Sequence, residues 1–313
     1  MKKCFGIDLG GTTVKMGLFE ENGVVLEKWE IPTRTEENGK YILSDIAKAV
    51  LDKMAEKGLN GEDIVGAGIG IPGPVMPDGY VSACVNLGWR NVNPGKGLSD
   101  LLGGISVCVG NDANVAALGE QWQGGGKGHD SVAAVTLGTG LGCGIILDGK
   151  IVSGSRGVAG ELGHVTVNRD ETEKCNCGNR GCLEFYASAT GIARLAKRHL
   201  AASDEASVLR GLEKITAKDV VDAAKAGDAL ADSVLEESMN WLAQGLSFVT
   251  LVVDPEVFVV GGGVSKAGDF LLDKLRRHYN HYTVMTATKP EIRVATLGND
   301  AGIYGAARMV LNM

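Results

Sequence analysis

The amino-acid sequence predicts an α/β protein made of two similar halves. Two stretches, at residues 4–26 and 131–152, repeat one pattern: a strand, a turn rich in Gly and Thr, a second strand, an Asn-Gly or Asp-Gly turn, and a third strand. Because the two Gly/Thr turns lie well apart in the sequence, we expect two halves that face a ligand cleft. An unrelated pair of hairpins is the alternative that the duplication alone leaves open.

Strand alternation and helical periodicity define the elements of the first half. Apolar residues alternate with polar or small ones after the first Gly/Thr turn, and Asn22-Gly23 supplies a hairpin turn. Apolar positions on one helix face begin at Ile42, and the helix stops at Gly58. The predicted strands cover residues 4–7, 14–19, 24–26, 65–71 and 105–109, and the predicted helices cover 42–57 and 113–118.

The second half repeats the three strands and then becomes mostly helical. Asp148-Gly149 is its second tight turn. Asn299-Asp300 is expected to cap a last helix, in which Gly302, Gly305 and Ala306 would allow close packing. The predicted strands cover residues 131–137, 143–147, 150–152 and 257–260, and helices are expected from about 187 to 253 and after 300.

Composition and charge limit the class of protein. The 313 residues suffice for two ordinary domains, and 44% hydrophobic with 22% charged residues exclude disorder and fibrous structure. The net charge of 31 − 38 = −7 disfavours a nucleic-acid partner, which needs a basic surface. No apolar run reaches about 18 residues, so neither a membrane span nor an export signal is expected. The odd count of 7 Cys indicates a reducing, cytoplasmic compartment rather than a disulfide scaffold.

Three glycine-rich loops at strand ends favour a nucleotide site. In the loop Asp8–Thr13 the glycines let backbone N–H groups converge on a phosphate, and the Thr hydroxyls add donors. Asp8 is placed to hold Mg²⁺ through water. One such loop is more often an ordinary hairpin, but Gly138–Gly142 is a second, and Gly261–Gly263 suits an adenosine. The sequence motifs of dinucleotide and Walker-type sites are absent.

Three cysteines and one histidine form a candidate zinc site. Cys175, Cys177 and Cys182 lie within eight positions, and His164 precedes them by eleven. Three thiolates and one imidazole complete a closed tetrahedral set that leaves no position for a reactive water. A structural Zn²⁺ that ties a loop to the body of the protein is therefore expected, with a group of free thiols as the alternative.

Several carboxylates are candidates for chemistry or for sugar binding. Asp112 opens a predicted helix, where capping is the commoner role and orienting a hydroxyl for phosphoryl transfer is the catalytic alternative. Glu161 and His164 share one face of a turn, and Glu184 follows the last Cys of the cluster. Fixed acceptors of this kind suit the hydroxyls of a sugar. Surface exposure is the usual state of Glu and remains the alternative for Glu161 and Glu184.

Together these motifs resemble the ROK family (repressors, open reading frames and sugar kinases) of the actin-like ATPase superfamily. The resemblance spans essentially the whole chain and rests on residues 8–13, 137–142, 160–164 and the C-x-C-G-x-x-G-C-x-E run ending at Glu184. Residues 86–89, 120–122 and 187–191 most resemble the bacterial glucokinases of the family. Cys143 departs from the pattern, because the family more often has Gly there.

The resemblance implies an actin-like (ribonuclease H-like) fold whose two lobes close over a sugar. MgATP would transfer its γ-phosphoryl group to the 6-hydroxyl of glucose, with Asp112 as the catalytic base and Zn²⁺ as a structural metal. The implied sugar contacts are Gly73, Asn86, Asn111, Asp112, Glu161, His164 and Glu184. The expected nucleotide contacts are Asp8, Gly10, Gly11, Thr12, Thr13, Lys15, Gly138, Thr139, Gly140, Gly262 and Gly263.

Lobe boundaries, partners and competing functions follow from the same resemblance. The smaller lobe is expected at residues 1–112 plus 299–313 and the larger lobe at 113–298, and a homodimer is expected. His164 would bind zinc through one nitrogen and address the sugar through the other. A kinase for N-acetylmannosamine, N-acetylglucosamine or fructose stays open. A sugar-responsive repressor is not expected, because the first phosphate loop begins at Asp8 and leaves no room for a helix-turn-helix module.

Overall fold

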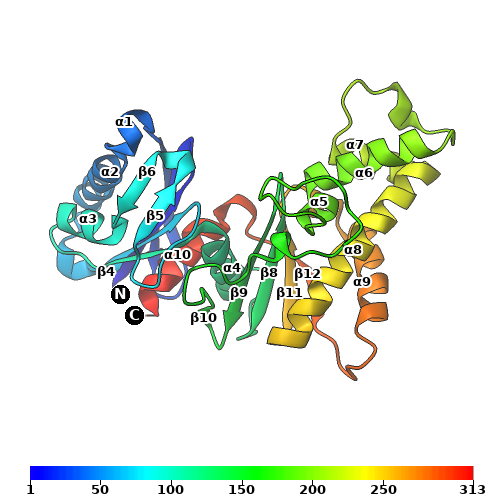
Figure 1. The fold of residues 1–313 in the computed structure, drawn as a ribbon. Helices are drawn as coiled ribbons and strands as arrows, with labels where there is room; N and C mark the ends of the chain where they lie inside the picture. The colour runs from blue at the N-terminus through cyan, green and yellow to red at the C-terminus, as the bar shows by residue number, and fades with distance from the viewer. Residues whose placement is uncertain (313) are drawn as a thin grey trace. The chain divides into compact units, whose positions relative to one another are not determined.

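The computed structural model, which describes residues 1–312, contains two five-stranded sheets with the same connectivity (Figure 1). The strand orders are β3-β2-β1-β4-β7 and β10-β9-β8-β11-β12. In the first sheet β1 pairs with β4 in parallel, and in the second β8 pairs with β11 in parallel. The duplicated α/β halves that the two Gly/Thr turns predict are therefore confirmed.

The helices and strands follow in chain order. The strands are β1 (Lys3–Leu9), β2 (Thr13–Glu20), β3 (Val25–Pro32), β4 (Ile64–Ile71), β5 (Val81–Cys84), β6 (Trp89–Val92), β7 (Val107–Asn111), β8 (Val132–Leu137), β9 (Leu141–Leu147), β10 (Lys150–Ile151), β11 (Val257–Gly261) and β12 (Glu291–Val294). The α-helices are α1 (Glu36–Gly39), α2 (Ile42–Glu56), α3 (Pro94–Leu101), α4 (Asp112–Gln123), α5 (Glu184–Ala187), α6 (Ala189–Ala202), α7 (Ala217–Lys225), α8 (Ala229–Val253), α9 (Asp269–Tyr282) and α10 (Ala301–Leu311).

Internal contacts divide the chain into two compact units. The first unit comprises residues 1–131, 144–160 and 297–312, and the second comprises 132–143 and 161–296. Helix α4 belongs to the first unit because it packs against α10. The lobe boundaries expected from the sequence, 1–112 plus 299–313 and 113–298, stay a prediction.

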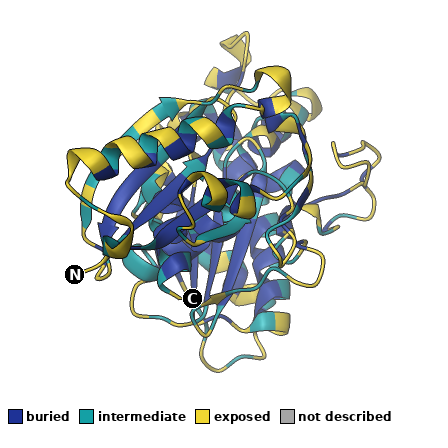
Figure 2. Cartoon of the chain, turned by 90° about the vertical axis from the view of Figure 1, so that its left-hand side faces the viewer, coloured by how far each residue is buried: buried dark blue, intermediate teal, exposed yellow. Residues whose placement is uncertain are grey.

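Alternate residues of β1 build two apolar layers in the first unit. Phe5 and Ile7 point into a core that also contains Ile46 and Val50 of α2. Cys4 points to the other face, where it packs with Ile303 of α10. The central strands are accordingly buried, and the helices expose only their outer faces (Figure 2).

Helix α10 packs unusually close to its neighbours because glycines line the contact. A Cβ on Gly305 would lie 1.6 Å from the carbonyl oxygen of Val115 in α4, and a Cβ on Gly6 would lie 1.9 Å from that of Ile303. The close packing expected for the last helix is thus confirmed. Asp300 stands at its N-cap position but makes no capping hydrogen bond, and it forms a 2.7 Å ion pair with Lys28 instead.

Gly305→Ala is expected to destabilise the first unit strongly. The added methyl group overlaps a backbone carbonyl that cannot rotate away, so α10 must shift, which typically costs about 1–3 kcal/mol or more. Chemical denaturation measures the free energy of unfolding. Gly61→Ala is the matched control, since a Cβ there meets nothing within 4 Å. Equal stability of the two variants would contradict the close contact.

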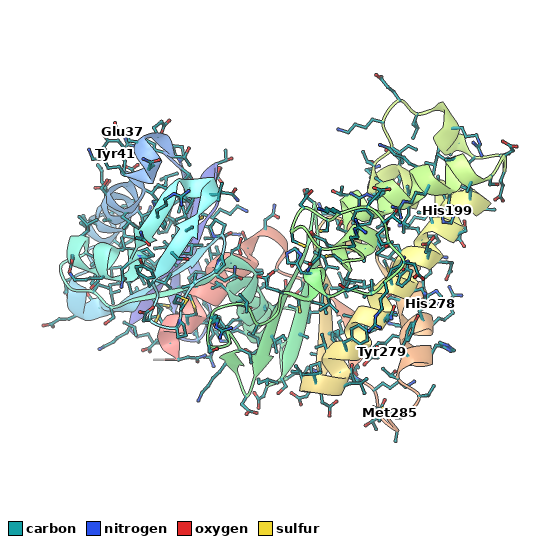
Figure 3. The ribbon with its side chains drawn as sticks, viewed as in Figure 1. Glu37, Tyr41, His199, His278, Tyr279 and Met285 are labelled. Atoms are coloured by element: carbon teal, nitrogen blue, oxygen red, sulfur yellow. The ribbon has the colours of Figure 1, made fainter. Side chains whose placement is uncertain are left out.

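Helices α8 and α9 lie side by side in the second unit. A carboxylate of α8, Glu236, accepts hydrogen bonds from Lys274 at 2.7 Å and from Arg277 at 2.7 Å, and it lies 2.8 Å from the labelled His278 (Figure 3). Buried Val257 and Phe258 place β11 in the core of this unit. Among the described residues, no helix is long and apolar enough to cross a membrane.

Candidate active site

The first phosphate loop is a tight turn between β1 and β2. Gly10 N–H donates to the carbonyl of Thr13 at 3.0 Å, which closes the turn. Gly11 and Thr12 at its tip are exposed. The predicted contact of their backbone N–H groups with a phosphate is compatible with this exposure and stays a prediction.

Asp8 and Lys15 face each other across the two strands of this hairpin. They are register partners, and Lys15 donates to the carbonyl of Asn299 at 3.2 Å. Burial raises the pKa of Asp8, and the charge of Lys15 opposes this effect. Gly302 makes room for the carboxyl group, because a Cβ there would lie 2.6 Å from its carbon. Mg²⁺ binding by Asp8 stays a prediction, which rests on the preference of Mg²⁺ for carboxylate oxygens.

Asn111 and Asp112 join β7 to α4, and the structure shows which of them caps the helix. Asn111 is the N-cap, since its side-chain oxygen accepts from Asn114 N–H at 3.1 Å. Its amide group donates to the carbonyl of Gly73 at 3.1 Å and to Asp112 Oδ1 at 3.0 Å. Ala113 N–H donates to the same Oδ1 at 2.8 Å. The N-cap residue is therefore Asn111 and not Asp112, whose half-buried carboxylate is held by these two hydrogen bonds.

Asn86 lies in a short 3₁₀ turn, Val85–Leu87, of the same unit. Its side chain is exposed while Leu87 is fully buried, so the backbone is anchored and the amide is presented to solvent. Burial raises the pKa of Cys84, two residues earlier, and the Asp112 carboxylate acts in the same direction. The first unit thus brings Gly73, Asn111 and Asp112 into direct contact and carries Asn86 nearby.

Three hydrogen bonds hold the second phosphate loop, which lies between β8 and β9: one forms within the loop, and two come from α6. Gly138 N–H donates to the carbonyl of Gly140 at 3.0 Å. At the start of α6, Ala189 N–H donates to the carbonyl of Gly138 at 2.8 Å, and the Thr190 hydroxyl donates to that of Thr139 at 2.8 Å. The contribution of Thr190 was not predicted; its signals in the sequence were the helix start at Ser188 and the resemblance of residues 187–191 to the glucokinases.

The third glycine loop lies directly on the second. A Cβ on Gly262 would lie 2.4 Å from the carbonyl oxygen of Leu137, so only glycine allows this approach. Gly262 has a φ of 86°, and its carbonyl accepts from Ser265 Oγ at 2.8 Å. Gly262 and Gly263 are exposed at the end of β11. The third loop therefore lies against the end of β8, where the second loop begins.

The four predicted zinc ligands come together in the second unit. The ligand atoms of His164, Cys175, Cys177 and Cys182 all lie within 4.8 Å of one another, and the Sγ atoms of Cys177 and Cys182 are 3.5 Å apart. Tetrahedral Zn²⁺ with bonds of about 2.3 Å to sulfur requires ligand atoms roughly 3.8 Å apart. The donor set and its spacing fit a structural zinc.

Glu184 connects this cluster to the second phosphate loop. Its Oε1 accepts from Cys175 Sγ at 3.1 Å and lies 3.8 Å from His164 Nδ1, while its Oε2 accepts from Leu141 N–H at 3.4 Å. Glu161 Oε2 lies 3.8 Å from the other nitrogen of His164. The second unit thus brings Glu161, His164 and Glu184 together, and the exposed Glu161 leaves its carboxylate open to a ligand.

A buried carboxylate anchors the cysteine-bearing segment to α6. Glu171, whose side chain is 4% exposed, accepts from Arg198 at 2.8 and 3.0 Å and from the Tyr186 hydroxyl at 2.5 Å. The hydrogen bonds from Arg198 lower the pKa of Glu171 to about 2, against the opposing effect of burial. Nothing in the sequence identifies this ion pair, because its partners lie 27 residues apart.

Glu171→Gln is expected to lower the free energy of unfolding at pH 7 by about 1.5–3 kcal/mol. Since the folded pKa lies below the ordinary value of 4.5, the stabilisation is complete above pH 4.5 and is lost as the pH falls toward 2. Denaturation curves over this range should converge for parent and variant. The exposed Glu173, which also contacts Arg198 at 2.7 Å, provides the control Glu173→Gln. A gap that persists at low pH would contradict the ion pair.

Comparison with known proteins identifies the family. The ROK family model matches residues 4–313. The chain belongs to the ROK family. A solved ROK hexokinase from Thermus thermophilus superimposes on it with a TM-score of 0.83 at 30% identity, covering 98% of this chain and 97% of that one.

Two further ROK relatives bear names that specify a substrate. A protein named Glucokinase from Halalkalibacterium halodurans is 42% identical over 97% of this chain and 94% of its own length. A ROK family glucokinase from Streptomyces griseus, solved in complex with glucose and AMPPNP, has a TM-score of 0.75 at 35% identity, with 98% of both chains covered. The predicted two-lobe actin-like fold of the family is confirmed by these structural neighbours.

Proposed function

We propose that this ROK protein is an ATP-dependent glucokinase, which transfers the γ-phosphoryl group of MgATP to the 6-hydroxyl of glucose and releases glucose 6-phosphate and ADP. The observation that carries the proposal is the fixed carboxylate of Asp112, held by Asn111 and Ala113 beside Gly73 in the unit that bears the first phosphate loop. The 42% identical relative named Glucokinase supports the choice of sugar.

Asp112 acts by orienting the sugar hydroxyl and accepting its proton. Phosphoryl transfer has a loose transition state, so a base that takes the proton late suffices, and an ionised Asp meets this demand. The Asn111 amide and Ala113 N–H occupy Oδ1 and fix the carboxylate plane. Gly73, Asn86 and Asn111 of the first unit, with Glu161, His164 and Glu184 of the second, are proposed to bind the sugar hydroxyls.

The nucleotide and the metals follow from the same assignment. The backbone N–H groups of the two phosphate loops would bind the triphosphate, with adenosine on the loop of Gly262 and Gly263. Asp8 would hold Mg²⁺ through water, and the metal would neutralise phosphate charge. Zn²⁺ on His164 and the three cysteines would stiffen the segment that carries Glu184. Reduced thiols and ATP suit the cytoplasm, and we propose a homodimer as the assembled form.

A coupled assay of ADP release over a panel of hexoses tests the proposed function. Glucose should give the highest kcat/KM, and mannose, fructose, N-acetylglucosamine and N-acetylmannosamine should give lower values. Product analysis should locate the phosphate on the 6-oxygen. Higher kcat/KM on N-acetylmannosamine or N-acetylglucosamine would replace glucose with that sugar, and no ADP release on any hexose would refute the kinase.

A further inference from the structure

The segment Thr33–Tyr41, here called the strap, begins on the first phosphate loop. Thr33 N–H donates to the carbonyl of Thr12 at 2.9 Å, and the Thr33 hydroxyl donates to the carbonyl of Gly10 at 2.7 Å. The first acceptor belongs to the tip of the loop, and the second belongs to the residue whose N–H closes the turn. The strap therefore holds the loop by two hydrogen bonds from a single residue.

The middle of the strap has a left-handed backbone. Glu37, Asn38 and Gly39 have φ values of 51°, 59° and 68°. Non-glycine residues are unfavourable in this region and persist there only when their surroundings hold them. The Tyr41 hydroxyl donates to Glu37 Oε1 at 3.1 Å, and both side chains are labelled in Figure 3. Lys40 Nζ lies 3.6 Å from the other oxygen of Glu37.

The left-handed turn packs tightly against the segment that carries Asn86. The indole N–H of buried Trp89 donates to the carbonyl of Gly39 at 3.2 Å. This hydrogen bond joins β6 to α1, which lie next to each other in Figure 1. A Cβ on Gly39 would lie 2.4 Å from the carbonyl oxygen of Leu87, and a Cβ on Gly88 would lie 2.8 Å from Cα of Asn38. Contacts this close fix the two segments to each other.

Asn86 also lies near the phosphate loop. A Cβ on Gly11 would lie 3.7 Å from the carbonyl oxygen of Asn86 and 3.8 Å from its Cβ, so the two segments are separated by about the space of a methyl group. Asn86 is joined to the loop through Trp89, Gly39 and Thr33. A change in the backbone of the loop must therefore be accommodated along this route.

We propose that the strap is a positioning element that couples the first phosphate loop to Asn86, so that nucleotide and hexose strengthen each other's binding. The inference rests on the proposed function, in which the loop binds phosphate and Asn86 binds sugar. Thr33 and Trp89 touch neither ligand in this scheme and act through the segments they hold. A ligand that fixes the position of the loop also fixes that of Asn86 through the strap, and the second ligand then binds a segment that is already in its bound position.

Calorimetric titration of glucose, with and without saturating AMPPNP, measures this coupling. In the parent protein AMPPNP should tighten glucose binding about 5-fold or more, and glucose should tighten AMPPNP binding by the same factor. Thr33→Val and Trp89→Phe should reduce that factor toward 1 while changing the Kd for glucose alone by less than about 2-fold. Thr33→Ser keeps the hydroxyl and should restore the coupling. Thr35→Val is the matched control, since Thr35 makes no side-chain capping bond.

Several outcomes overturn the inference and are distinct from failure of the proposed function. Coupling that is absent in the parent, that survives in both Thr33→Val and Trp89→Phe, or that falls equally in Thr35→Val would refute the strap's role. Coupling that Thr33→Ser fails to restore would also count against it. Absence of any glucose or AMPPNP binding by the folded parent would instead refute the proposed function.

Discussion

Asp112→Asn is expected to lower kcat by about 10²- to 10⁴-fold, the usual contribution of a general base. The amide keeps the size of the carboxylate and can still accept from Ala113 N–H, but it cannot take a proton from the sugar. The KM for glucose should change by no more than a few fold, because the other sugar contacts remain. Steady-state kinetics with saturating MgATP separates the two parameters.

Asp100→Asn is the control for this substitution. Asp100 lies on the exposed surface of α3, where it pairs with Lys96 at 2.5 Å, so its change should leave both kinetic parameters as in the parent. Unchanged unfolding transitions should show that Asp112→Asn leaves the fold intact. Turnover by this variant within 10-fold of the parent, below the usual range for a base, would remove Asp112 from its proposed role.

Cys177→Ala is expected to abolish zinc binding and, with it, most of the activity. Metal analysis of the parent should find one zinc per chain. Because Cys177 is exposed, the substitution removes a ligand without opening a cavity in the core. The backbone N–H of Asn179 lowers the pKa of the Cys177 thiol. Loss of the metal frees the segment that links the cysteines to Glu184, and the second phosphate loop loses its support at Leu141.

Cys108→Ala separates loss of zinc from loss of any cysteine. Cys108 is half-buried on β7 in the first unit, far along the chain from the cluster, and the variant should keep its zinc and its activity. Zinc retained at one per chain in Cys177→Ala would contradict the four-ligand site. Full activity after complete removal of zinc by a chelator would show that the metal does not support the loop.

Local patterns explain why much of the fold could be predicted from the sequence. The Gly/Thr turns and the tight turns after β2 and β9 recur in the same order in both halves, and both tight turns contain a glycine with a positive φ, Gly23 and Gly149. Asp148 and Gly149, for example, both have positive φ values, 52° and 71°. The candidate zinc ligands could also be predicted from the sequence, because three of them lie within eight positions of one another.

Contacts between distant segments could not be read from the sequence. Glu184 was expected only as a sugar contact, yet its Oε2 also reaches Leu141, 43 residues away. Asp112 was considered a helix cap, because the pattern does not distinguish it from Asn111. The left-handed backbone of residues 37–39 could not be predicted, because Asn38 packs against Gly88 and Gly39 accepts a hydrogen bond from Trp89, both far along the chain. Such features arise only from tertiary structure.

A crystal structure with glucose and AMPPNP bound tests the central proposal most directly. A carboxylate oxygen of Asp112 is expected within about 2.6–3.2 Å of the sugar 6-oxygen, the reach of a general base. The phosphates should lie on the backbone N–H groups of Gly10–Thr13 and Gly138–Gly140. Ligands bound away from both loops, or a 6-oxygen beyond the reach of Asp112, would contradict the proposal.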